Sequence, residues 1–145
     1  MKGSFAKIAV SVILTFAMLV GAAFLTPVGA AQIEDETVSP LWVGISNVNI
    51  DMSFSGNEGN ATGTLTKSST ASSMEATLTV YRWSGSQWVF VDSASGTKTR
   101  GTLMLSIDFD AVAGTRYKAV FDVTVYTNNV PESESIDVEK TCPTP

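Results

Sequence analysis

The sequence predicts an all-β protein, a seven-stranded antiparallel two-sheet sandwich that follows an N-terminal signal-peptide helix. Three observations lead to this prediction. After Pro40 the chain becomes rich in Ser, Thr and Val, and β-branched residues favour strands. Apolar and polar residues alternate in several short runs, as in strands with one buried face. Turn-forming residues separate these runs at short intervals, and this spacing is typical of a sandwich.

Residues 1–30 are predicted to be a secretory signal peptide. Lys2 and Lys7 supply its positive charge, and residues 8–25 form an apolar run. A proline then breaks the helix, and Val28-Gly29-Ala30 offers the small residues that a signal peptidase reads. The alternative is a retained membrane anchor, for which the run is of borderline length. We expect cleavage after the small-residue triplet, with membrane contact only through this segment before cleavage.

The remainder of the chain divides into three expected parts. Residues 31–40 are acidic, lack periodicity and end at a proline, so we expect a linker. Residues 41–140 contain all the alternating runs and are expected to form the sandwich domain. Residues 141–145 are expected to be a flexible tail.

The first four expected strands are residues 48–54, 61–67, 74–83 and 87–92. The first alternates without fault, and Gly and Asn residues then break the chain. The second is weaker because Leu65 is its only large apolar residue. The third has one apolar face, made by Met74, Ala76, Leu78 and Val80. A Ser-Gly-Ser turn leads from the third strand into the fourth.

Three more strands are expected at residues 103–109, 116–126 and 133–140, after a loop at 93–101. The fifth strand has one apolar face, made by Leu103, Leu105, Ile107 and Phe109. The sixth has a longer one, made by Tyr117, Ala119, Phe121, Val123 and Val125. The seventh is polar throughout and therefore suits the edge of a sheet.

The segment VAGTRYKAVFDVTV, residues 112–125, resembles the fibronectin type III and wider immunoglobulin-like pattern, in which Gly-Thr precedes a tyrosine and an alternating strand. The resemblance implies that Tyr117 is the corner tyrosine, with its ring in the core and its hydroxyl bonded to backbone in the preceding turn. Fibronectin type III also has a tryptophan in its second strand, which residues 61–67 lack. We therefore expect an immunoglobulin-like sandwich without strict adherence to fibronectin type III. With its signal segment, the chain is similar to small secreted proteins of Gram-positive bacteria.

The hairpin sequence YRWSGSQWVFV concentrates the aromatic residues of the chain. Because Val80 faces inward with Leu78, alternation places Tyr81 and Trp83 outward, with Arg82 beside them. Aromatic and arginine side chains dominate binding hot spots. Tyr81, Arg82 and Trp83 are therefore the candidate ligand-binding residues.

The returning strand of this hairpin allows two arrangements. If Val89 and Val91 face inward, Trp88 and Phe90 join Tyr81 and Trp83 on one exposed aromatic face. Alternatively, a β-bulge near Gln87 turns Trp88 into the core and leaves only the third-strand aromatics outside. The second arrangement is the one we favour from the sequence.

The residue inventory excludes several catalytic classes. The chain has no histidine and one cysteine, so it cannot form Ser-His-Asp or Cys-His catalytic sets, a His-rich zinc site or a multi-thiolate site. Asp108 with Asp110, and Asn57 with Glu58 and Asn60, supply oxygen ligands but lack the spacing of a calcium loop. We expect no catalytic residue, no metal and no cofactor.

Charge and export define the expected role. The net charge is −5, which disfavours nucleic acid as a partner. We expect an extracellular or cell-surface, non-enzymatic binding or adhesion module whose partner is a protein or glycan at the cell surface. The alternative is a structural or self-associating envelope protein, with Cys142 linking two chains into a disulfide dimer.

Overall fold

The computed structural model describes residues 42–145. The predicted signal peptide, residues 1–30, and the predicted linker, residues 31–40, lie outside the described residues. Among the residues that are described, no helix is long and apolar enough to span a bilayer.

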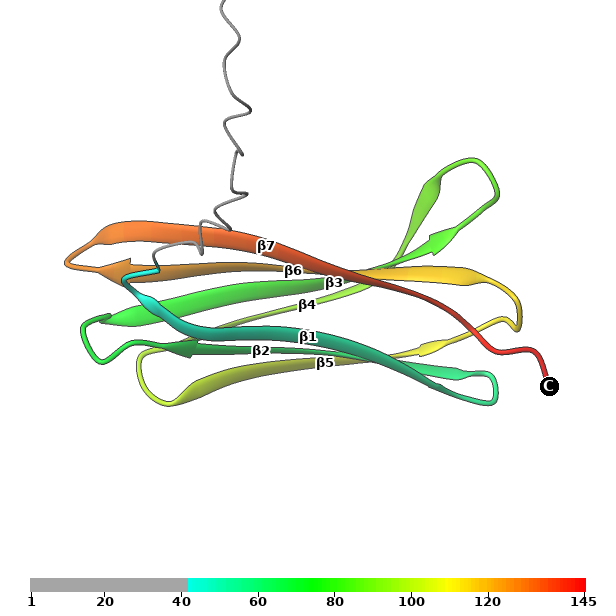
Figure 1. The fold of residues 1–145 in the computed structure, drawn as a ribbon, viewed down its shortest axis with the longest axis horizontal. Coiled ribbons are helices and arrows are strands. Elements are labelled where there is room, and N and C mark those ends of the chain that lie inside the picture. The colour runs from blue at the N-terminus through cyan, green and yellow to red at the C-terminus, as the bar shows by residue number, and fades with distance from the viewer. Residues whose placement is uncertain (1–41) are drawn as a thin grey trace, which may run out of the picture. The chain divides into compact units, whose positions relative to one another are not determined.

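Seven strands form two antiparallel sheets that pack face to face (Figure 1). The strands are β1 (Ile45–Ser55), β2 (Glu58–Lys67), β3 (Ser73–Trp83), β4 (Trp88–Lys98), β5 (Thr102–Asp110), β6 (Arg116–Thr127) and β7 (Val130–Thr141). One sheet has the order β1-β2-β5 and the other β4-β3-β6-β7. The predicted seven-stranded, two-sheet sandwich is thus confirmed.

Two short turns set the register of the outer hairpins. Gly56, at φ 60°, lies in the two-residue turn that pairs Ser55 with Glu58. Asn128 and Asn129, at φ 52° and 63°, form the turn between β6 and β7. Positive φ at both central residues is the type I′ geometry, which asparagine tolerates and which matches the twist of the strands.

Strand β4 is longer than expected, because the loop expected at residues 93–101 is strand as far as Lys98. Hydroxyl groups stabilise this extension: Ser95 Oγ lies 2.9 Å from Thr77 Oγ1 on β3. On the other face, Gly96 lets β4 approach β5, since a Cβ there would lie 3.1 Å from Leu105. The small polar residues that suggested a loop are those that allow this close packing.

The centre of the core is a contact between the two sheets. Phe121 on β6 is fully buried, and a Cβ added to Gly63 on β2 would lie 2.6 Å from its ring. The ring therefore lies directly against the β2 backbone, where only glycine leaves room. Leu65, Leu78 and Ala119, all fully buried, belong to the same core.

Tyr117 fills one end of the core and is 1% exposed. Its ring centroid lies 5.1 Å from that of Phe109 and 5.7 Å from that of Phe54. The backbone N–H of Val112 donates to the Tyr117 hydroxyl at 2.9 Å. A buried ring with its hydroxyl bonded to backbone a few residues upstream is the geometry of a tyrosine corner.

Residues 141 and 142 are held in the structure within the tail expected at residues 141–145, whereas residues 143–145 are exposed and outside any strand. Strand β7 continues to Thr141, and Cys142 is fully buried and free. The Cys142 N–H donates to the Thr115 carbonyl at 2.9 Å, and the Gly114 N–H donates to the Cys142 carbonyl at 2.9 Å. A disulfide between two chains would require this segment to leave the sandwich.

Side chains of β7 bridge the edges of the two sheets. Lys140 Nζ donates to Asp51 Oδ1 at 2.9 Å and to the Met52 carbonyl at 2.6 Å. The hydrogen bond from Lys140 holds the pKa of Asp51 below its ordinary value. At the other end, the Gly44 N–H donates to Glu132 Oε2 at 2.7 Å. These bonds join β7 to β1 and the residues just before it.

Tyr117 tests the corner geometry. Tyr117→Phe removes the hydroxyl that Val112 N–H bonds and should lower the free energy of unfolding by about 0.5–1.5 kcal/mol. Tyr117→Ala also opens a cavity beside Phe109 and should cost about 3–5 kcal/mol. Urea unfolding measures both. A Tyr117→Ala protein as stable as the wild type would contradict the role of Tyr117 as a buried corner tyrosine.

Gly63 tests the contact between the sheets. Gly63→Ala forces a methyl group into the Phe121 ring and should lower the free energy of unfolding by about 1–3 kcal/mol, the usual cost of overpacking. The control is the same change in a Phe121→Leu background, where the smaller side chain should reduce the cost of the methyl group. Equal costs in the two backgrounds, by urea unfolding, would show that the residues do not couple.

Candidate functional site

An aromatic and cationic patch covers one end of the outer surface of the four-stranded sheet. Along most of β3 this surface bears Thr and Glu side chains, but near the hairpin it bears Tyr81 and Trp83. In the paired strands Tyr81 lies between Phe90 on β4 and Lys118 on β6, and Trp83 pairs with Trp88. We call the following residues the aromatic face: Tyr81, Trp83, Trp88, Phe90, Arg116 and Lys118.

A β-bulge at Val91 produces this arrangement. Val80 pairs with Asp92 but Tyr81 pairs with Phe90, so Val91 is an additional residue in β4. The bulge lets residues on both sides of it keep their hydroxyl and aromatic side chains on the outer surface, while Val91 packs against the core. Bulges also increase the local twist, and Figure 1 shows the hairpin end rising away from the other strands.

The bulge lies at Val91 and not near Gln87, so the arrangement favoured from the sequence is wrong. Trp88 does not enter the core. Its ring pairs edge-to-face with that of Trp83, at 5.2 Å between centroids and an interplanar angle of 63°. The other arrangement, with all four hairpin aromatics on one face, is the one observed.

Two cations from β6 lie over the tryptophan rings. The guanidinium carbon of Arg116 is 5.0 Å from the ring centroid of Trp83 and 5.2 Å from that of Trp88. Lys118 Nζ is 5.6 Å from the centroid of Trp88. At these distances the negative faces of the rings attract the cations. The cations and rings therefore hold one another in place.

Carboxylates on β7 complete the rim of the aromatic face. Glu139 lies 3.8 Å from Arg116 and 3.5 Å from Lys118, and Asp137 lies 3.7 Å from Lys118. These side chains are substantially exposed, so solvent screening leaves each ion pair with little stabilising energy. Their main effect is to place hydrogen-bond donors and acceptors beside the rings.

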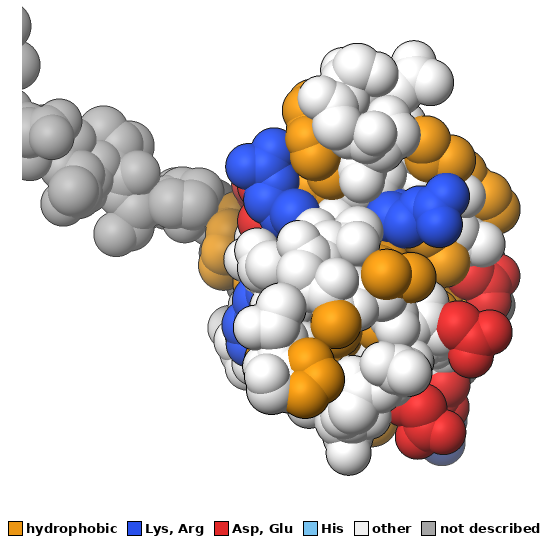
Figure 2. Space-filling view, turned by 90° about the vertical axis from the view of Figure 1, so that its right-hand side faces the viewer, with side chains coloured by type: hydrophobic (Ala, Val, Ile, Leu, Met, Phe, Trp, Pro, Cys, Tyr) orange, Lys and Arg blue, Asp and Glu red, His pale blue; other side chains and the backbone are white. Residues whose placement is uncertain are grey.

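One ring of the aromatic face is exposed and the other three are half-buried at the surface. Phe90 is 60% exposed and meets Tyr81 edge-to-face at 6.5 Å. None of the four hairpin aromatics belongs to the hydrophobic core. Figure 2 views this end of the molecule, where hydrophobic side chains flank the projecting hairpin and basic side chains lie below it.

The three residues proposed from the sequence divide between two faces of β3. Tyr81 and Trp83 belong to the aromatic face. Arg82 is exposed but alternates to the opposite side, where its cross-strand partners are Tyr117 and Val89. The cations that do accompany the rings, Arg116 and Lys118, were not identified from the sequence. Their alternation in β6 indicated an outward direction, but the pairing of β6 with β3 was needed to place them.

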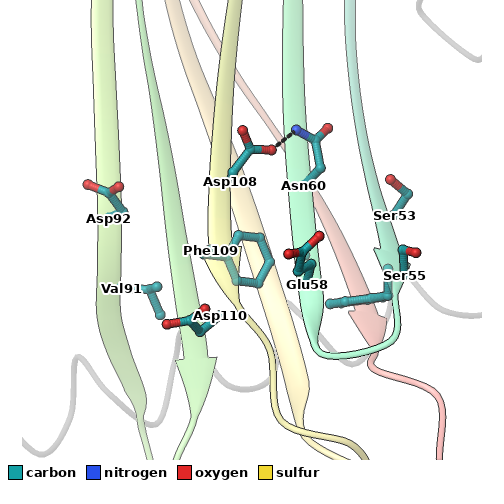
Figure 3. Close-up of a pocket in the computed structure, with 11 residues that line it drawn as sticks. Ser53, Ser55, Glu58, Asn60, Val91, Asp92, Asp108, Phe109 and Asp110 are labelled. Atoms are coloured by element: carbon teal, nitrogen blue, oxygen red, sulfur yellow. Dashed lines mark hydrogen bonds between the residues drawn. The ribbon is translucent and has the colours of Figure 1, made fainter. Parts of the chain in front are cut away.

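An acidic pocket is lined by residues of β1, β2 and β5 and by Val91 and Asp92 of β4 (Figure 3). Its carboxylates are Glu58, Asp92, Asp108 and Asp110. Asn60 Nδ2 donates to Asp108 Oδ1 at 2.6 Å. Within residues 42–145, no three potential ligands of the His, Cys, Asp and Glu types group closely enough to hold a metal ion. The pocket is thus a concentration of negative charge on the surface.

Arg116 and Arg82 provide a matched pair for testing the cation–ring contacts. Arg116→Gln removes a cation from two tryptophan rings and should lower the free energy of unfolding by about 0.5–1 kcal/mol. Arg82→Gln, on the opposite side of β3, should have a smaller effect. Urea unfolding followed by tryptophan fluorescence measures both. Equal effects would show that the contacts with the rings contribute nothing.

No protein-family model and no curated protein matches the chain. Solved structures similar to it include β-glucuronidase from Parabacteroides merdae, with 16% identity and a TM-score of 0.43 over 68% of this chain and 14% of that one. R. palustris CsgH has 15% identity and a TM-score of 0.41, covering 66% of this chain and 90% of CsgH. The sensor domain of the anti-sigma factor RsgI4 from Pseudobacteroides cellulosolvens has 23% identity and a TM-score of 0.34, covering 68% and 98%. At these scores the similarities support no inference about activity.

Proposed function

We propose that the chain is an exported, non-enzymatic binding module and that the aromatic face is its binding site. One observation carries the proposal: four large aromatic side chains gather on the surface, outside the core, on a single hairpin. Exposed apolar patches of this kind on soluble proteins mark sites of interaction. The predicted signal peptide, residues 1–30, supports action outside the cell or at its surface.

The chemistry of the face suits a protein or glycan at the cell surface. The rings offer apolar contact to a sugar ring or to an apolar side chain. Arg116 and Lys118 offer donors, while Glu139 and Asp137 offer acceptors at the rim. An apolar centre with a few polar groups that fix orientation is the usual composition of a binding site.

The proposal includes an immunoglobulin-like fold, without strict adherence to fibronectin type III. In the constant-type immunoglobulin arrangement the fourth strand joins the first, second and fifth. Here β4 pairs with β3, in the sheet of β6 and β7. This division differs from the constant-type arrangement, and the hydrogen bond from the Val112 N–H to the Tyr117 hydroxyl is what supports the immunoglobulin-like resemblance.

The alternative of a disulfide-linked envelope protein receives less support. Cys142 is fully buried and bonded through its backbone to the loop before β6. Its thiol therefore does not lie where a second chain could reach it. A binding role needs no such rearrangement, because the aromatic face already lies at the surface, with Phe90 exposed and the other rings half-buried.

The double variant Tyr81→Ser, Trp83→Ser tests the site. It removes two cross-strand aromatic pairs, which should lower the free energy of unfolding by about 1–3 kcal/mol and leave the domain folded. Binding to an array of defined oligosaccharides and to whole cells should be lost. Thr124→Ala with Ser133→Ala is the matched control, because it removes a hydroxyl pair from the same outer surface far from the rings.

Two results would contradict the proposal. If the double variant stays folded and binds as the wild type does, the site lies elsewhere. If the control variant loses binding to the same extent, the loss reflects a general change in the sheet and not the aromatic face.

A further inference from the structure

The two edge strands of the four-stranded sheet differ in how they are protected. Strand β7 carries Pro131, several acidic residues and the Lys140 bridge to β1, all of which oppose pairing with another chain. Strand β4 has neither a proline nor a charge between Asp92 and Lys98. Its bulge at Val91 lies to one side of this stretch. Between these two charges, residues 93–97 form an extended edge of small residues without proline or charge.

The hydrogen bonds of β4 show which residues face the free edge. The Ser93 N–H donates to the carboxylate of its neighbour Asp92 at 2.8 Å, from which we infer that it points away from β3. In an antiparallel ladder, alternate residues direct both N–H and C=O away from the partner strand. Ser95 and Thr97 therefore present their backbone groups on the same side as Ser93. The side-chain hydroxyls of Ser95 and Thr77, 2.9 Å apart, agree with a close, non-hydrogen-bonded pair.

We propose that β4 pairs with β4 of a second copy of this chain, antiparallel and centred on Ser95. The stretch Asp92-Ser-Ala-Ser-Gly-Thr-Lys98 is self-complementary in this register. In this register Ser95 pairs with Ser95 of the second copy. Ser93 of each copy pairs with Thr97 of the other, and Asp92 of each copy pairs with Lys98 of the other. On pairing, the Ser93 N–H exchanges the Asp92 carboxylate for the Thr97 carbonyl of the second copy, which leaves that carboxylate available to Lys98.

Charge complementarity favours a second copy over another occupant. Asp92 lies in the acidic pocket with Glu58, Asp108 and Asp110, and no basic side chain lines that pocket. The proposed register brings Lys98 of the second copy beside Asp92, on the same face of the sheet. Lys98 is exposed and bonds only the Thr102 carbonyl, at 2.9 Å. Each chain thus supplies a cation to the negative pocket of the other.

The pairing has a consequence for the aromatic face. Edge-to-edge pairing about a twofold axis keeps the outer surfaces of both four-stranded sheets on the same side. The dimer would therefore carry two aromatic faces in one plane, at opposite ends of the seam. A surface with repeated ligands could engage both at once and gain avidity. The dimer itself does not depend on the proposed binding function.

Cysteine substitution tests the register. Ser95→Cys places two thiols opposite each other at about 5.5 Å between Cα atoms, within the range of a disulfide. Ser93→Cys is the matched control, because its two copies would lie about 13 Å apart, four residues along the seam. Both substitutions are made in the chain as it is recovered from the expressing cell. Each variant is then oxidised with copper phenanthroline or treated with a short bis-maleimide. Ser95→Cys should cross-link at least tenfold faster.

Charge reversal tests the same register without cross-linking. Asp92→Lys and Lys98→Asp each place like charges opposite one another at both ends of the seam. Each should weaken dimerisation at least tenfold in sedimentation equilibrium. The double variant restores opposite charges and should recover wild-type association. Because the contact is small, we expect weak association, and the measurement needs protein concentrations up to the millimolar range.

Three outcomes would overturn the proposal. The first is equal cross-linking of the two cysteine variants. The second is a wild-type chain that remains monomeric at the highest concentration. The third is hydrogen-exchange protection of β4 that arises only when a different protein is added, which would assign the edge to another partner. These experiments use no ligand. A negative result would therefore not bear on the proposal that the aromatic face is a binding site.

Discussion

The Phe121 ring lying on the backbone of Gly63 is the constraint on which the sandwich depends. Strands β6 and β2 are interior strands of their sheets, so this contact determines how the two layers approach. It also determines which residues of β6 face outward. With Phe121 and Tyr117 inside, Arg116 and Lys118 lie outside by alternation. The cations of the aromatic face are therefore placed by the packing of the core.

The Val91 bulge is the second constraint, and it separates two uses of β4. Between the bulge and the turn, β4 carries Trp88 and Phe90 and belongs to the aromatic face. Beyond the bulge it is a straight edge of small polar residues, with Ser95 at its centre. A continuous ladder would place Phe90 and Ser93 on opposite sides of the sheet. One extra residue brings both to the outer surface.

Alternation in the sequence was enough to predict the strands and the outward direction of Tyr81 and Trp83, because one face of each strand is buried. The position of the bulge could not be obtained in this way, since it depends on how Val80 and Val91 share the space over the core. The extension of β4 to Lys98 was also missed. Its support comes from Leu103 and Leu105 on β5, which pack against Gly96 and are remote from the start of β4 in the chain.

The burial of Cys142 has the same origin. A cysteine near the end of a chain suggests an accessible thiol, but the connection before β6 accepts and donates backbone bonds that hold Cys142 in the core. The one thiol is thus withdrawn from the surface. The association that we propose for this chain therefore uses backbone and charge instead of a disulfide. Strand β4 is the edge that we propose for this role, with Asp92 and Lys98 at the two ends of its stretch of small residues.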